Sequence, residues 1–152
     1  MKITAKPFMV LPMIALIALL QLNCLAQSGK STAILHIGST EISINGETST
    51  LDVAPVVMND RTLVPLRAIV EGLGGVVAWE PETETAVFAY GENMIFLTVG
   101  SKTAFVNTTM HTLDVEPVVI NDRTMLPLRF VAENLGFDVE WDEETQGITV
   151  FG

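Results

Sequence analysis

The chain contains one segment written twice, and this duplication constrains its fold more than any other feature. Residues 35–90 align without a gap on residues 97–152, at a constant offset of 62 positions, and 25 of the 56 aligned pairs are identical. The match is densest between residues 51–79 and residues 113–141. Any architecture for this chain must therefore be built from two units of one kind.

Each unit is predicted to begin with short antiparallel strands. Residues 40–44 alternate polar and apolar side chains, as a half-buried strand does. Asn59 and Asp60 stand between the short apolar runs 56–58 and 63–64. Because Asn and Asp tolerate positive φ, this pair favours a tight hairpin turn. The second unit repeats the pattern over residues 118–126.

A short helix is predicted next in each unit. Apolar residues recur at i, i+3, i+4 and i+7 from Leu66 and again from Leu128, which is typical of one buried helix face. Pro65 stands where a first-turn proline is tolerated, and Gly74 stands where a left-handed cap is wanted. A second hairpin follows each helix, with acidic turns at residues 80–83 and 142–145.

These elements predict an α+β fold class, in which each unit has antiparallel strands packed on one short helix. Unit one spans about residues 33–90 and unit two about residues 94–152. The link of residues 91–93 has only turn length, so the last strand of unit one is expected to pair with the first strand of unit two. A lone unit of this size would be marginally stable, which favours one compact two-helix domain.

The first 26 residues indicate an export signal rather than part of the fold. Lys2 and Lys6 precede an apolar run of 13 residues (8–20), and Cys24-Leu25-Ala26 offers small residues before a cut. This is the three-part pattern of a secretory signal peptide, cleaved here after Ala26. The run is shorter than the ~20 residues of a spanning helix. An uncleaved anchor and a lipid on Cys24 remain alternatives to a secreted, extracellular or cell-surface protein.

The mature segment 27–152 would be acidic and free of thiols. It has six basic and 18 acidic residues, a formal net charge of −12, and no Cys. Such a charge disfavours nucleic acid and anionic membrane surfaces as partners. It also makes anionic wall polymers poor partners unless a cation bridges them.

The duplication gives an internal test for catalytic or metal-binding residues. His36 aligns with Thr98 and His111 aligns with Ser49, so neither His is kept between units. No Ser/His/Asp or Cys/His arrangement can be assembled from the mature chain. The sequence therefore predicts no catalytic residue, no metal site and no cofactor.

Several polar residues are kept in both units. Asp52 and Asp60, with their copies Asp114 and Asp122, favour caps and turns, although paired carboxylates also suit Ca²⁺ or acid/base work. The repeated Arg61 and Arg123 are expected to pair with nearby carboxylates, with partner contact as the alternative.

Each unit has one tryptophan, Trp79 or Trp141, at the end of the strand after the helix. A tryptophan there commonly covers a sheet edge and closes a core. It can also stack on a sugar or hold a peptide. Together with Arg61 and Arg123, the two tryptophans are the candidate partner-contact residues.

At the level of motifs, the chain resembles the copper amine oxidase N-terminal-domain-like, or stalk-domain, family. The resemblance rests on VVMNDRTLVPLR at residues 56–67 and VVINDRTMLPLR at residues 118–129, followed by a helix ending in Leu-Gly, then Val-x-Trp and an acidic turn. It covers residues 35 to 152 in two copies. The Asp60 and Asp122 positions often hold Gly in that pattern, which affects only the turn.

This resemblance implies a non-catalytic extracellular module: a small antiparallel sheet packed on a helix, which in amine oxidases projects as a stalk. Copper binding and amine oxidation belong to another domain, which needs three His ligands and a Tyr converted to a quinone. This chain has two unmatched His and one Tyr, Tyr90, so neither activity is expected.

The sequence thus favours a secreted, non-enzymatic accessory domain that acts by surface contact. Its expected partner is a cell-wall polymer, another exported protein or a second copy of itself. One alternative is a carbohydrate- or peptide-binding module that uses exposed tryptophans. Another is a Ca²⁺-dependent domain or small hydrolase that uses Asp52, Asp60 and their copies.

Overall fold

The computed structural model describes residues 30–152, and the expected signal peptide and Cys24 lie outside these residues. Fourteen strands and two helices follow one another in this part of the chain. Their order and bounds are β1 (Thr32–His36), β2 (Glu41–Ile44), β3 (Glu47–Thr50), β4 (Val56–Met58), β5 (Arg61–Val64), α2 (Leu66–Gly72), β6 (Val76–Glu80), β7 (Thr85–Tyr90), β8 (Asn93–Thr98), β9 (Thr103–Val106), β10 (Thr109–Thr112), β11 (Val118–Ile120), β12 (Arg123–Pro127), α3 (Leu128–Asn134), β13 (Asp138–Asp142) and β14 (Gly147–Phe151).

The fold is mostly β, so the α+β class predicted from the sequence is wrong. Strands hold 51% of the described residues and helices only 11%. The helices are short because a proline with non-helical ψ precedes each of them, 86° at Pro65 and 107° at Pro127, and a glycine with positive φ follows, Gly74 at +94° and Gly136 at +98°. Strand content was underestimated because β3 and β10 have no apolar alternation to reveal them; every residue of β3 is exposed.

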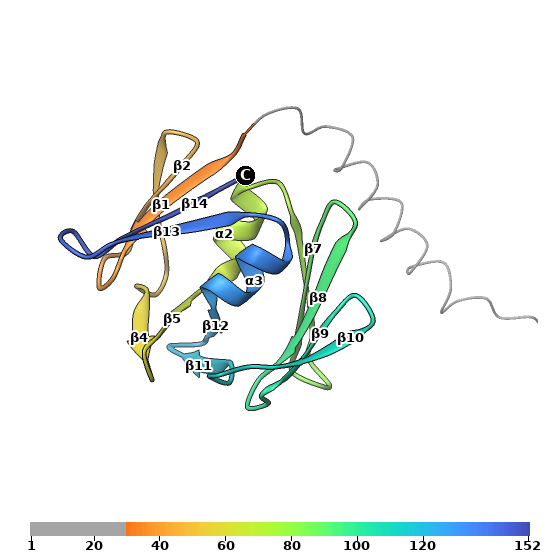
Figure 1. Cartoon of the computed structure of the whole chain (residues 1–152). Coiled ribbons are helices and arrows are strands. Elements are labelled where there is room, and N and C mark those ends of the chain that lie inside the picture. The colour runs from red at the N-terminus through yellow and green to blue at the C-terminus, as the bar shows by residue number, and fades with distance from the viewer. Residues whose placement is uncertain (1–29) are drawn as a thin grey trace, which may run out of the picture.

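Two five-stranded antiparallel sheets flank the helices, and each takes strands from both units (Figure 1). Sheet I has the order β13-β14-β1-β2-β3, and sheet II has the order β6-β7-β8-β9-β10. In each, the two strands after one unit's helix join the three first strands of the other unit. Neither unit could complete either sheet alone.

The strand pairing that links the units was predicted in one place and missed in another. β7 pairs with β8 over six residue pairs, which confirms the expected pairing of the end of unit one with the start of unit two. The reciprocal pairing of β14 with β1 was not anticipated. It is extended by two backbone hydrogen bonds between Ser31 and Gly152, at 2.9 and 3.1 Å. The repeat is thereby closed into a ring.

A smaller sheet III, with the order β11-β12-β5-β4, joins the units at the centre. Its middle strands pair through Leu126 with Val64 and Pro127 with Leu63. The tight turn predicted at Asn59-Asp60 is confirmed, because both residues take positive φ, 49° and 61°, between β4 and β5. Consecutive positive φ values are those of a type I′ hairpin, whose twist matches the strands that it joins.

One apolar core fills the space between sheets I and II and around both helices. Leu66, Ile69 and Val70 of α2 are buried there, as are the equivalent α3 residues Leu128, Val131 and Ala132. Complete burial of one aliphatic side chain is worth roughly 1.5–3 kcal/mol. The helices are therefore held by packing between the sheets rather than by their own length. Among residues 30–152, neither helix has the length and apolar character to cross a membrane.

Candidate functional site

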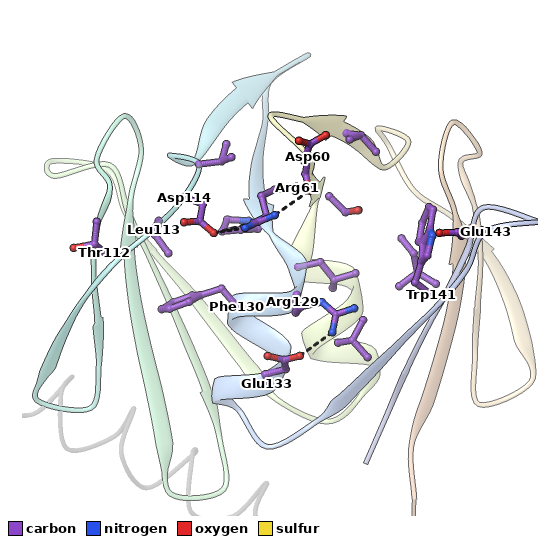
Figure 2. A pocket seen from close by; sticks show the side chains of 17 residues that line it. Asp60, Arg61, Thr112, Leu113, Asp114, Arg129, Phe130, Glu133, Trp141 and Glu143 are labelled. Atoms are coloured by element: carbon purple, nitrogen blue, oxygen red, sulfur yellow. Dashed lines mark hydrogen bonds and ion pairs between the residues drawn. The ribbon is translucent and has the colours of Figure 1, made fainter.

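A groove of about 830 Å³ lies over α3, where sheets I and II diverge. Figure 2 shows α3 along its floor, Trp141 on one wall, Asp114 and Thr112 on the opposite wall, and the β4–β5 hairpin above. The volume falls in the ~300–1,000 Å³ range of ligand-binding clefts. Residues from both units form it, so the site exists only in the assembled domain.

Trp141 supplies the largest apolar side chain on the groove wall. In β13 it pairs with the buried Ile148 of β14, and paired residues point to the same face of a sheet, here the helix side. Because β13 is an edge strand, Trp141 is still 41% exposed. Its indole therefore packs along the sheet and also presents surface to the groove.

An ion pair between the units borders the groove. Arg61, at the start of β5, donates from Nε and Nη2 to Oδ2 of Asp114, at 2.9 and 2.6 Å. In the equivalent pair the arginine belongs to unit two and the aspartate to unit one: Arg123 Nε lies 2.7 Å from Asp52 Oδ2. Both pairs are largely exposed, so each contributes at most about 1 kcal/mol to stability. Their main effect at the groove is to fix the Arg61 guanidinium.

The helix floor has one aromatic side chain and a second ion pair. Phe130 is half-buried on α3, and His111 of β10 meets its ring edge-on at a centroid distance of 5.9 Å. Arg129 donates from Nη1 to Oε1 of Glu133, one helical turn later, at 3.0 Å. The groove thus offers two aromatic surfaces, Trp141 and Phe130, with charged groups between and around them.

Two of the four predicted contact residues, Trp141 and Arg61, line this groove. Trp79 and Arg123 hold the equivalent positions in the other copy and are not part of it. Trp79 is 39% exposed, nearly the same as Trp141, so exposure does not separate the two. The two differ in that Trp141 lines the groove over α3 together with Phe130, whereas the residue equivalent to Phe130 in the other unit is Ala68.

The sequence reasoning missed Phe130 because it looked for residues kept in both units. The residue equivalent to Phe130 is Ala68. The sequence signal that could have found Phe130 is a difference between the units: one helix has a bulky aromatic residue at a position where the other helix has alanine. Differences between the copies locate this groove better than identities do.

The described residues do not fit a copper centre. His36 lies in β1 and His111 in β10, in different sheets. Within residues 30–152, no three His, Cys, Asp or Glu side chains come together in a way that could hold a metal ion. Asp52 and Asp114, weighed above as calcium ligands, are bound instead by Arg123 and Arg61.

Fold and groove together define a small two-repeat β domain with a surface groove over α3. The chain belongs to the copper amine oxidase N-terminal domain family, whose model matches residues 23–87 and again 43–150. This family is an accessory N-terminal domain rather than a catalytic one. The tandem resemblance inferred from the motifs is confirmed.

The chain is also similar to a protein of Brevibacillus choshinensis described as a protease inhibitor, with 32% identity over 101 residues. The aligned part is 65% of this chain but only 31% of that protein. The chain therefore spans about a third of the relative's length. No solved structure matches the chain.

Proposed function

We propose that residues 27–152 are exported after cleavage at Ala26 and act as a non-catalytic accessory module. The module binds an extended segment of a partner protein in the groove over α3. The observation that carries this proposal is the groove over α3 itself, with Trp141 and Phe130 as apolar surfaces and fixed ion pairs beside them.

The groove suits a peptide with one apolar anchor and nearby basic side chains. Trp141 and Phe130 provide the kind of rigid aromatic surface that dominates protein contacts. Four acidic residues, Asp60, Asp114, Glu133 and Glu143, line the groove against two arginines. Both arginines are already ion-paired, so the unmatched charge available to a ligand is negative.

Two further points favour a protein over a wall polymer. The net charge of −12 opposes anionic polymers. The relative from Brevibacillus is described as a protease inhibitor, and such a protein acts by contact with another protein. Inhibition of a protease is not assigned to this chain, because the aligned segment is only 31% of that relative.

The test is a selection from phage-displayed random dodecapeptides on immobilised residues 27–152, followed by affinity measurement of the enriched peptides. We expect peptides with an aromatic or large aliphatic residue near Lys or Arg. Trp141→Ala should weaken their binding at least about tenfold, roughly 1.4 kcal/mol. Trp79→Ala is the matched control, because it removes the same side chain from the equivalent place outside the groove. Absence of enrichment, or equal losses in both variants, would refute the proposal.

A carbohydrate ligand is the second candidate, favoured by the exposed edge-strand indole of Trp141. Co-sedimentation with isolated peptidoglycan at low and high salt separates the two. Salt-resistant pelleting that Trp141→Ala abolishes and Trp79→Ala preserves would replace the peptide by a glycan.

A further inference from the structure

The outer face of sheet II has an uninterrupted apolar row across all five strands. The strand registers place Ala78 opposite Val87, Val87 opposite Phe96, Phe96 opposite Phe105, and Phe105 opposite Met110. Directly opposed residues point to the same face. Their neighbours along the strands, such as Leu97 and Ala104, are buried toward the helices, so this row points outward.

The row is open to solvent at its far end. Phe105 is 42% exposed and Met110 is 66% exposed, the highest exposure of any large apolar side chain among residues 30–152. Single exposed apolar residues are ordinary, but a contiguous row across a whole sheet marks an interaction surface.

Sheet I is a natural control for this row, because the duplication builds it from equivalent residues. Its corresponding row is Glu140, Thr149, Ile34, Ser43 and Thr48, joined by the same cross-strand pairs. Only Ile34 is a large apolar residue. The scaffold therefore folds without an apolar row at these positions, so folding does not explain the row on sheet II.

Charge separates the two outer faces as well. In the register rows described here, the outer face of sheet I has carboxylates at Asp138, Glu140, Asp142 and Glu41. The corresponding rows of sheet II contain Glu80 alone. Two copies of residues 27–152, each with a formal net charge of −12, repel each other over most approaches, and sheet II offers the approach with least repulsion.

We propose that the outer face of sheet II packs against the same face of a second copy, as an isologous dimer. Two twisted sheets can pack face to face about 10 Å apart with interdigitating side chains. Five strands about 4.8 Å apart and roughly 18 Å long give some 400–450 Å² per copy. Both copies together would bury about 800–900 Å², which lies below the ~1,200 Å² typical of stable complexes, so the dimer is weak and reversible.

The test is sedimentation equilibrium of residues 27–152 over a wide concentration series. Residues 27–152 contain every strand and helix that the structure describes, together with the backbone pairing of Ser31 and Gly152. The test variant combines Phe105→Ser and Met110→Thr, which introduces the residues of Ser43 and Thr48 in sheet I. The control is Ile34→Thr, which removes the exposed apolar side chain from the outer face of sheet I.

We expect the wild type to pass from monomer to dimer as concentration rises, and high salt to strengthen the dimer by screening the like charges. The double variant should raise the dimer dissociation constant at least tenfold, and Ile34→Thr should leave it unchanged. A monomeric wild type at every concentration refutes the proposal. So does a double variant that dimerises as well as the wild type, or a control that loses dimerisation to the same extent.

Hydrogen exchange of the wild type keeps the test decisive if the double variant misfolds. Amides of β9 and β10 should gain protection between dilute and concentrated samples, whereas those of β2 and β3 should not. Equal protection in both sheets, or none, excludes the surface. This surface is separate from the groove, so Trp141→Ala should leave dimerisation intact.

Discussion

Ring closure through β1 and β14 predicts that the chain can be circularly permuted at the junction between the units. The permutant begins at Glu92, runs to Gly152, continues through an inserted Asn-Gly to Ser31, and ends at Gly91. The backbone hydrogen bonds between Ser31 and Gly152 already hold these residues as a paired position, where a two-residue type I′ turn fits. The new ends fall in the turn between β7 and β8.

The expected cost is small because the permutation exchanges one hairpin turn for another. Unfolded chain length changes by two residues, and loop closure varies only slowly with length. Fraying at the new ends leaves a loss of about 0–1 kcal/mol, which lowers the melting temperature by at most about 4–8 °C. Thermal and urea unfolding followed by circular dichroism measure it, and the urea m-value should be unchanged.

A truncation ending at Gln146 is the contrasting variant, because it removes the β14 pairing instead of rerouting it. It exposes the sites of the buried Ile148 and Val150, worth roughly 3–6 kcal/mol together, against a total stability of about 5–15 kcal/mol. We expect this variant to unfold or to melt far lower. A permutant as damaged as the truncation would show that β14 and β1 are not neighbours, and the closed ring would be wrong.

Three further predictions concern local structure. Gly75→Ala should lower the free energy of unfolding in urea by about 1–3 kcal/mol, because an added Cβ would lie 2.9 Å from the carbonyl oxygen of Ala89. Gly72→Ala should lower it by less, because the added Cβ there meets the flexible end of an isoleucine side chain. Arg61→Ala should lose no more than about 1 kcal/mol, and the loss should shrink at high salt; a loss above 2 kcal/mol would mean that the exposed pair does more than its geometry allows. Asp60→Gly should leave the free energy of unfolding unchanged or raise it by up to about 1 kcal/mol, because Asp60 has φ 61° and glycine adopts positive φ without strain; a clear drop in urea unfolding would contradict the turn.

The hairpins and helices could be predicted from the sequence because local chemistry specifies them. Consecutive residues that tolerate positive φ, such as Asn59 and Asp60, fix a turn wherever they occur between apolar runs. The class was nevertheless wrong, because edge strands such as Glu47–Thr50 have no buried face and so no periodic signal. The β1–β14 pairing was missed for a different reason: it joins residues at opposite ends of the chain, and no local pattern encodes such a contact.

The candidate site was predicted in part. Retention in both units drew attention to Trp141 and Arg61, which do line the groove. It also drew attention to Trp79 and Arg123, which do not line this groove. Residues that are identical in the two units have different surroundings in the folded domain. The partner of Arg61 could not be predicted, because no local pattern favours Asp114, 53 positions away, over a carboxylate closer in the chain.

Duplication explains why both proposed contact surfaces lie where the units differ. Both units need the same turns, core and ion pairs to fold, so their turn residues, buried aliphatic residues and ion-paired residues are kept in both copies. Exposed positions have no such constraint, and solubility alone would favour polar residues at them in both copies. Yet Phe130 replaces an alanine on one helix, and Phe105 and Met110 stand on one sheet face where the other has Ser43 and Thr48. Apolar side chains held on one copy only, in a segment (residues 27–152) of formal net charge −12, are better explained by contact than by folding.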